Sequence, residues 1–193
     1  MGEFMKSVDA IKDKNVLALI PDLLTKKSKN AQYADIWEFS LNVALRISDT
    51  LSIKFDDIDL DTRTLKISES KTGKQATIYL NDKAYSIVEK IRKDSPSDVY
   101  LFQSKKSRNR SNTEPKPLTR FAVSQQMQKI SEVLDINIGT HSARKTRGYF
   151  LYKKTGDIAR VMKMLRHSSA LVTLAYIGIT QEDIDTDFKD LVL

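Results

Sequence analysis

Apolar residues recur at helical spacing along most of this chain. A segment with one apolar and one polar face at this spacing is typical of an amphipathic α-helix. Residues 31–45 are instead apolar on nearly all sides, which predicts a buried central helix. The segments for which we predict helices are 15–24, 31–45, 82–93, 123–134, 141–154, 157–165 and 170–177.

One stretch follows the two-residue period of a β-strand. Residues 65–67 and 76–80 alternate between apolar and polar, and residues 71–74 between them hold a glycine. This predicts an antiparallel hairpin. Residues 99–102 are a candidate for a short third strand, whereas residues 55–61 read as a polar, turn-rich link. The predicted fold class is mainly α with a small antiparallel β-sheet (α+β).

Length and composition favour a globular domain and exclude several other classes of protein. With 193 residues, 40% hydrophobic and 30% charged, the chain suits one globular domain, or a domain plus an arm. No segment is apolar for long enough to span a bilayer, and the N-terminus lacks a signal-peptide pattern. Without cysteine and with two histidines, the chain has neither a disulfide framework nor the ligand spacing of a zinc site.

The charge is strongly positive and unevenly spread. The formal net charge is +7, and Lys and Arg concentrate in residues 104–120 and 141–166, each with a single acid. Residues 182–190 are acidic instead. Two basic blocks in one domain favour binding to a phosphate backbone, although a solvated basic face is the simpler interpretation of either block alone.

The first half of the chain contains two candidate catalytic residues. Arg46 follows the most apolar helix, and a buried arginine must be paired because an isolated desolvated charge is costly. An internal salt bridge, for example to Asp49, is the alternative to a functional role. Lys71 lies at the hairpin turn. It serves either solubility and edge protection or, as a mobile ammonium, contact with a phosphate or a leaving-group oxygen.

The second half adds further candidates. His141 and Arg144 are three residues apart near a helix start, where a bound anion is favoured, and Thr140 is the expected cap. The alternative is a helix-start histidine with an incidental arginine. Tyr176 follows His167 by nine residues in an apolar helix, and alone it would be interpreted as core packing.

Together, these residues resemble the catalytic domain of the tyrosine recombinase, or phage integrase, family. The resemblance covers residues 12–189. Its elements are Arg46 within Leu-Arg-Ile-Ser-Asp, Lys71 in a hairpin, His141-x-x-Arg144, and His167 nine residues before Tyr176. It implies a mainly helical fold with a small sheet, and a site-specific DNA recombinase of a mobile element that integrates or otherwise recombines DNA.

The resemblance also implies a role for each catalytic residue. Cleavage and rejoining would pass through a 3′-phosphotyrosine, with no metal, ATP or other cofactor. The implied roles are phosphate clamps for Arg46 and Arg144, a further phosphate donor for His167, nucleophile for Tyr176, general base for His141, general acid for Lys71, and orientation of the cationic cluster for Asp49.

Two positions depart from the family pattern. Arg166 stands where glycine is most common, and it either contacts phosphate or changes the turn. Asp49 stands where glutamate is common. Candidate DNA-binding residues lie in both basic blocks: Lys105, Lys106, Arg108, Arg110, Lys116, Arg120, Lys145, Arg147 and Arg166.

The predicted organisation is a single catalytic domain. Residues 1–4 read as a cloning scar, residues 5–193 as the catalytic domain, and about 180–193 as its tail helix. The family's N-terminal core-binding domain is missing, so the chain is either an excised fragment or a naturally short recombinase. We expect double-stranded DNA as the partner, a monomer in isolation and a homotetramer on paired sites, in the bacterial or phage-infected cytoplasm. The tail either exchanges between protomers or packs on its own domain.

Two rival functions remain at this point. A type IB topoisomerase uses similar chemistry but relaxes supercoiled DNA without paired sites. A DNA-binding relative without activity would lack part of the catalytic set, which this sequence retains.

Overall fold

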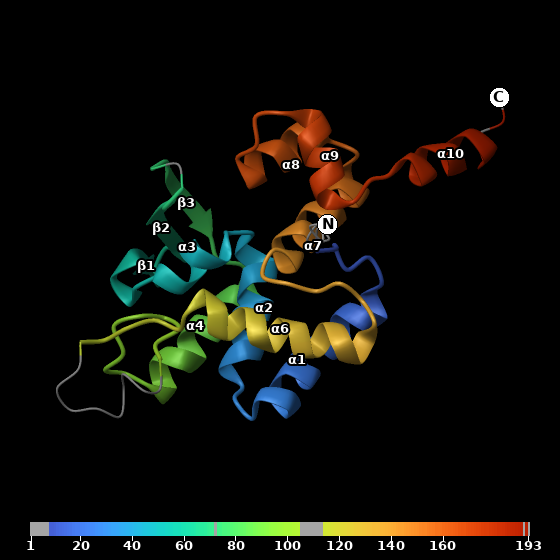
Figure 1. The fold of residues 1–193 in the computed structure, drawn as a ribbon. Helices are drawn as coiled ribbons and strands as arrows, with labels where there is room; N and C mark the ends of the chain where they lie inside the picture. Colours follow the sequence, from blue (N-terminus) through green and yellow to red (C-terminus); the bar gives the residue numbers. More distant parts are fainter. Residues whose placement is uncertain (1–7, 72, 105–113, 191, 193) are drawn as a thin grey trace, which may run out of the picture.

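The computed structural model describes residues 8–71, 73–104, 114–190 and 192. It is mostly helical with one small sheet at its edge (Figure 1), which confirms the predicted fold class. Residues 1–4, the predicted cloning scar, lie outside the described residues. The elements are α1 (Lys14–Ser28), α2 (Gln32–Val43), α3 (Ile47–Ser52), the 3₁₀ turn η1 (Phe55–Asp57), β1 (Ile58–Asp59), β2 (Thr64–Ser68), β3 (Gln75–Tyr79), α4 (Asp82–Asp94), α6 (Arg120–Leu134), α7 (Ser142–Thr155), α8 (Ile158–Leu165), α9 (Ala170–Ile177) and α10 (Gln181–Asp190).

The sheet has the order β1-β2-β3 and is antiparallel throughout. Leu65 lies opposite Ile78, so the predicted hairpin and its alternation are confirmed. The predicted third strand at 99–102 is wrong, because Tyr100 forms only an isolated bridge with Lys54. The third strand is β1, inside the segment interpreted as a polar link. Asp59 accepts a hydrogen bond from the Thr62 backbone N–H (2.9 Å), which turns the chain back onto β2.

Apolar side chains gather in two clusters. The larger lies among α1, α2, α4 and α6 and includes the buried rings of Phe39 and Phe102, which meet edge to face with centroids 5.6 Å apart. The smaller is centred on Val161, Leu165 and Ile177 of α8 and α9. Helix α7 runs from the helices around the larger cluster to the α8–α9 pair (Figure 1). The first turn of α7 therefore stands where the two clusters meet.

Helix ends correct two local predictions. Helix α2 ends at Val43 rather than at residue 45, because Ala44 adopts the left-handed conformation (φ 53°). Arg46 is consequently the N-cap residue of α3. Thr140 is not the cap of α7. His141 holds that position without a side-chain capping bond, and the Ser142 hydroxyl instead accepts from the Gly139 N–H (3.0 Å).

The C-terminal helix α10 extends away from the rest of the molecule (Figure 1). Phe188 is 81% exposed, so this part of the tail helix is not packed on its own domain. Lys12 reaches Asp183 near the start of α10 (Nζ to Oδ2, 3.6 Å). Among the described residues, no helix has the length and apolar character needed to cross a membrane.

Candidate active site

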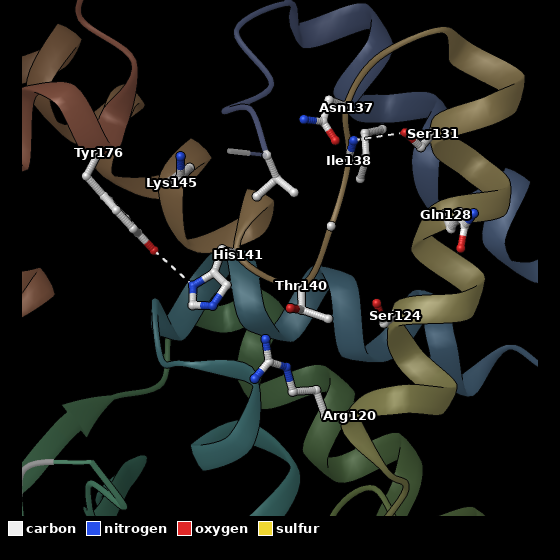
Figure 2. A pocket seen from close by; sticks show the side chains of 12 residues that line it. Arg120, Ser124, Gln128, Ser131, Asn137, Ile138, Thr140, His141, Lys145 and Tyr176 are labelled. Carbon is white, nitrogen blue, oxygen red and sulfur yellow. Dashed lines mark hydrogen bonds between the residues drawn. The ribbon is translucent and has the colours of Figure 1, made fainter. Parts of the chain in front are cut away.

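Tyr176 occupies the last turn of α9, and its side chain is directed toward the start of α7 (Figure 2). Its hydroxyl lies 3.4 Å from Nδ1 of His141. The His167 ring stands edge-on to the tyrosine ring, with centroids 4.9 Å apart. The Lys145 ammonium lies 5.1 Å from the centre of the same ring. The fold thus brings three predicted catalytic residues and one lysine together within one chain.

Arg144 is the buried centre of the site, with its residue only 2% exposed. Its Nη1 donates to the carbonyl of Ala44 and its Nη2 to the carbonyl of Leu165. These carbonyls stand at the C-terminal ends of α2 and α8, where backbone acceptors lack partners within their own helices. The guanidinium therefore ties two helix ends together in addition to placing positive charge in the site.

Arg46 is paired, but with a different acid from the one expected. Its Nη1 lies 3.0 Å from Oε2 of Glu69, whose side chain is fully buried. Asp49 faces the hairpin instead, and its Oδ1 accepts from the backbone N–H (3.0 Å) and the hydroxyl (2.6 Å) of Ser70. Because Lys71 is the next residue, Asp49 anchors the base of the exposed turn that carries the lysine.

Arg166 has both a backbone and a side-chain role. It is the C-cap residue of α8, in the left-handed conformation (φ 53°). A residue with a Cβ is less stable there than glycine by about 1 kcal/mol, which accounts for the family's preference. The side chain donates from Nη1 to Oε1 of Glu69 (2.9 Å). Glu69 thus joins Arg46 and Arg166 across the site.

Burial and charge set the protonation of the site. Burial lowers the pKa of His141, and the neighbouring cations of Arg120 and Arg144 lower it further, so the ring is neutral at neutral pH. Burial also raises the pKa of the Tyr176 phenol, while the charge of Arg144 and a hydrogen bond from it oppose the increase. The phenol therefore keeps its proton in the absence of substrate, beside an imidazole that can accept it.

The tautomer of His167 follows from Thr173. The Thr173 hydroxyl gives its only proton to the carbonyl of Ser169 (2.6 Å), so it accepts from Nδ1 of His167 (3.2 Å). Nε2 of the neutral ring then carries a lone pair, and it donates to a phosphate oxygen only after the ring is protonated. Burial and the charge of Arg144 lower the pKa of His167, so this donation requires an anion nearby.

An open cavity of about 800 Å³ adjoins the nucleophile. It is lined by α6, the loop before α7, α7 and α9, and Arg120, His141, Lys145 and Tyr176 all contribute side chains to its wall (Figure 2). Its open form and its two basic side chains suit an extended anionic chain rather than a small apolar ligand.

The predicted DNA-binding residues have different environments. Arg120 and Lys116 are exposed, whereas Lys145 is buried against Tyr176 and Arg147 lines separate hollows beside α7. Lys105, Lys106, Arg108 and Arg110 lie outside the described residues.

Comparison with known proteins identifies the family. The model of the phage integrase family matches residues 10–183. The chain belongs to the phage integrase family. A probable integrase/recombinase of Bacillus subtilis, YoeC, is 31% identical over 186 residues, which cover 96% of this chain and 97% of that protein. The tyrosine recombinase XerA of Pyrococcus furiosus is 22% identical, and the match spans 72% of this chain and 48% of that protein.

Solved structures of recombinases share the fold. XerH bound to its difH substrate in a post-cleavage complex superposes with a TM-score of 0.72 at 15% identity, over 94% of this chain and 52% of that one. The crystal structure of XerA gives 0.70 at 14% identity, over 95% and 64%. The integrase family and the enzyme class, a tyrosine recombinase, are those predicted from the sequence, and neither rival function is favoured by these relatives.

Sequence reasoning missed several residues of this phage integrase site. Glu69 and Ser70 precede Lys71 in the hairpin, and Thr173 lies between His167 and Tyr176. Glu69 carried one usable signal. It is an acid at a position where the alternation of the strand, with Leu65 and Ile67 buried, places the side chain toward the interior.

Proposed function

We propose that this chain cleaves and rejoins DNA strands as the catalytic module of a site-specific recombinase. The observation that carries the proposal is the position of the Tyr176 hydroxyl, 3.4 Å from the His141 imidazole and beside the buried guanidinium of Arg144. A nucleophile, a neutral base and a fixed cation in one chain are the parts that phosphoryl transfer requires.

In the first chemical step, the Tyr176 oxygen attacks the scissile phosphorus and its proton passes to His141. The bond to the 5′ oxygen breaks, and Lys71 supplies the proton that this leaving group takes. One phosphodiester linkage becomes one phosphotyrosine linkage, so attack by a 5′-hydroxyl on that linkage rejoins the strand without ATP.

Charge that develops on the non-bridging oxygens must be stabilised by fixed donors. Arg46 and Arg144 provide planar guanidinium groups suited to two phosphate oxygens. Arg144 keeps N–H groups beyond the two that bind carbonyls, since a guanidinium has five. His167 adds a donor from Nε2 once the bound phosphate has favoured its protonation.

Double-stranded DNA is the proposed partner. The structures of similar fold include recombinases bound to DNA, and the cavity beside Tyr176 carries the basic side chains of Arg120 and Lys145. Binding by phosphate contacts weakens steeply with salt. A DNA substrate of this kind would place the protein in the cytoplasm of a bacterium or phage host.

Assembly into a homotetramer on paired sites is part of the same proposal. Helix α10 extends from the body and carries exposed Phe188 among acidic residues. An apolar ring that is unburied in its own chain supports docking of this tail on a neighbouring protomer, although a tail that folds back in solution would leave the catalytic proposal unchanged.

The test uses a pool of nicked duplexes with a randomised central segment. When cleavage occurs near the nick, the short product diffuses away and the covalent adduct is trapped on a denaturing gel. Wild-type protein should form an adduct on Tyr176 with a selected set of sequences. Tyr176→Phe should bind those duplexes with unchanged affinity and form no adduct, whereas Tyr152→Phe, a half-buried tyrosine of the same apolar cluster, should react normally.

Three results would contradict the proposal. An adduct that persists in Tyr176→Phe removes this residue as the nucleophile. Binding without any adduct in the wild type indicates a non-catalytic DNA-binding protein. Relaxation of supercoiled plasmid without sequence selection indicates a topoisomerase.

A further inference from the structure

Glu69 is a buried carboxylate that the proposed chemistry does not use. It directly follows β2, and its side chain is fully buried. A carboxylate in such a place is unstable unless cations compensate it. Arg46 supplies one cation at 3.0 Å and Arg166 the other at 2.9 Å, on the two separate carboxylate oxygens.

The compensation also works in the other direction. Arg46, Arg144 and Arg166 lie close enough that Arg46 and Arg166 each disfavour the charge on Arg144, while Glu69 favours it. Three guanidinium groups converging without an anion would repel one another and move apart. Glu69 therefore holds the cationic cluster together while the phosphate site is empty.

The backbone at Arg166 supports the same interpretation. This residue occupies a left-handed position that favours glycine, 97 residues away from Glu69 in the sequence. A long side chain gives no advantage to the turn itself. What the arginine adds is the hydrogen bond to Glu69, which fixes the end of α8 next to His167.

Glu69 also fixes the hairpin turn. Its N–H donates to the carbonyl of Lys74 (3.0 Å), and its carbonyl accepts from the N–H of Gly73 (2.8 Å). These bonds close the turn that contains Lys71. One residue thus connects the position of the proposed general acid with the position of the Arg46 guanidinium.

The geometry favours a supporting role over a blocking role. Nη1 of Arg46 is buried and lies 3.0 Å from Oε2 of Glu69, within ion-pair distance. The carboxylate thus balances the charge of Arg46 at Nη1, and the other N–H groups of the guanidinium, which has five in all, remain for a phosphate oxygen.

We propose that Glu69 is a positioning residue for strand cleavage, which holds Arg46 and Arg166 in the phosphate-binding cluster and ties to them the turn that carries Lys71. This inference rests on the proposed function.

The test compares Glu69→Gln with Glu38→Gln, which removes the same charge from a surface pair with Lys83. Glu69→Gln should bind the selected nicked duplex as tightly as wild type or more tightly, because a negative charge has left the cluster. Its adduct should form about 10- to 100-fold more slowly, because misplaced catalytic groups cost factors of this size. Glu38→Gln should change neither quantity.

Two further variants separate positioning from folding. Glu69→Asp keeps the charge but shortens the side chain, so it should slow the adduct step without weakening binding, even if Glu69→Gln does not fold. Arg166→Gly should slow the same step. The double variant Glu69→Gln with Arg166→Gly should be no slower than the slower of the two single variants, since each of them already removes the linkage between Glu69 and Arg166.

A second measurement does not depend on cleavage. The chain has two histidines, both in the site, so their imidazole NMR signals can be followed during a pH titration. Loss of the Glu69 charge should lower the pKa of His167, while Glu38→Gln should leave it unchanged.

The possible failures are distinguishable. If wild-type protein forms no adduct but the His167 titration moves as expected, the proposed function fails while the link between Glu69 and the cluster stands. An unchanged adduct rate in both Glu69 variants overturns the positioning role. A faster rate in Glu69→Gln shows that the carboxylate blocks the phosphate site, and an unmoved His167 titration overturns the electrostatic link.

Discussion

The two hydrogen bonds from Arg144 to backbone carbonyls predict that Arg144→Lys lowers the stability of the fold as well as the activity. The guanidinium reaches the carbonyls of Ala44 and Leu165 with separate nitrogens, whereas the single ammonium nitrogen of lysine cannot occupy both positions. At least one buried carbonyl loses its charged donor. A hydrogen bond to a charged group contributes about 1.5–3 kcal/mol, so we expect unfolding to become easier by about 2–3 kcal/mol.

Urea unfolding measures this loss directly. Trp37 is the only tryptophan and is buried in the larger core, so its fluorescence reports unfolding. With a slope of about 2 kcal/mol per molar urea, the midpoint should fall by about 1 M. Arg147→Lys is the matched control, because Arg147 lies on the same helix and its side chain makes no hydrogen bond or ion pair with a described residue. It should shift stability by less than about 0.5 kcal/mol.

The catalytic loss must then be measured where the variant is folded. At low urea and moderate temperature, Arg144→Lys should still form little adduct, because the ammonium cannot serve a helix-end carbonyl and two phosphate oxygens together. An unfolding midpoint equal to that of Arg147→Lys would refute the stabilising role of the carbonyl bonds. Normal adduct formation would refute the need for a planar fork at the phosphate.

Two further predictions concern pH and packing. The folded-state pKa values of His141 and His167 lie below the ordinary 6.5, so the unfolded chain binds more protons than the folded chain and stability falls as pH drops below 6.5. Urea midpoints should therefore decline between about pH 7 and about pH 5, and His141→Gln should reduce this decline. An equal decline in both proteins would contradict the assignment. A Cβ added at Gly148 would stand 2.7 Å from Ile177 Cγ2, so Gly148→Ala should displace α9, lower stability by about 1–3 kcal/mol and slow adduct formation. Wild-type stability and rate in that variant would show that α9 accommodates the methyl group freely.

The sequence predicted the elements better than their ends. Periodicity located the hairpin and the longer helices because apolar faces are set by burial, which repeats along each element, but it missed the short helix α3. It extended α2 to residue 45 rather than Val43, because Ala44 gives no sign of a left-handed residue. Ala44 is stable there since its carbonyl meets Arg144, a partner one hundred residues later in the chain. Such long-range compensation leaves no local pattern.

The residues of the candidate active site were likewise predicted better than their partners. His141, Arg144, His167 and Tyr176 were found because their order and spacing resemble those of the family, and the structure brings them together. Asp49 was the example given for an internal partner of Arg46, because it is near in the sequence, but the partner is Glu69. Asp49 points to Ser70 and Glu69 takes its place. Which of two acids meets a cation depends on side-chain direction, and this is decided only by tertiary packing.

The net charge of the cluster bears on why the site needs an internal acid. Arg46, Arg144 and Arg166 with Glu69 leave two positive charges around the place of the phosphate. A phosphodiester carries one negative charge, so the charge on these arginines already exceeds that of the bound substrate. A cluster without Glu69 would hold the substrate more strongly through its excess charge, and binding that is equal in ground and transition states does not accelerate the reaction. Glu69 removes one positive charge from the cluster, and its proposed hold on Arg46 and Arg166 lets these groups stabilise the developing charge by their position rather than by excess charge. This is why the expected result for Glu69→Gln is tight binding combined with slow cleavage.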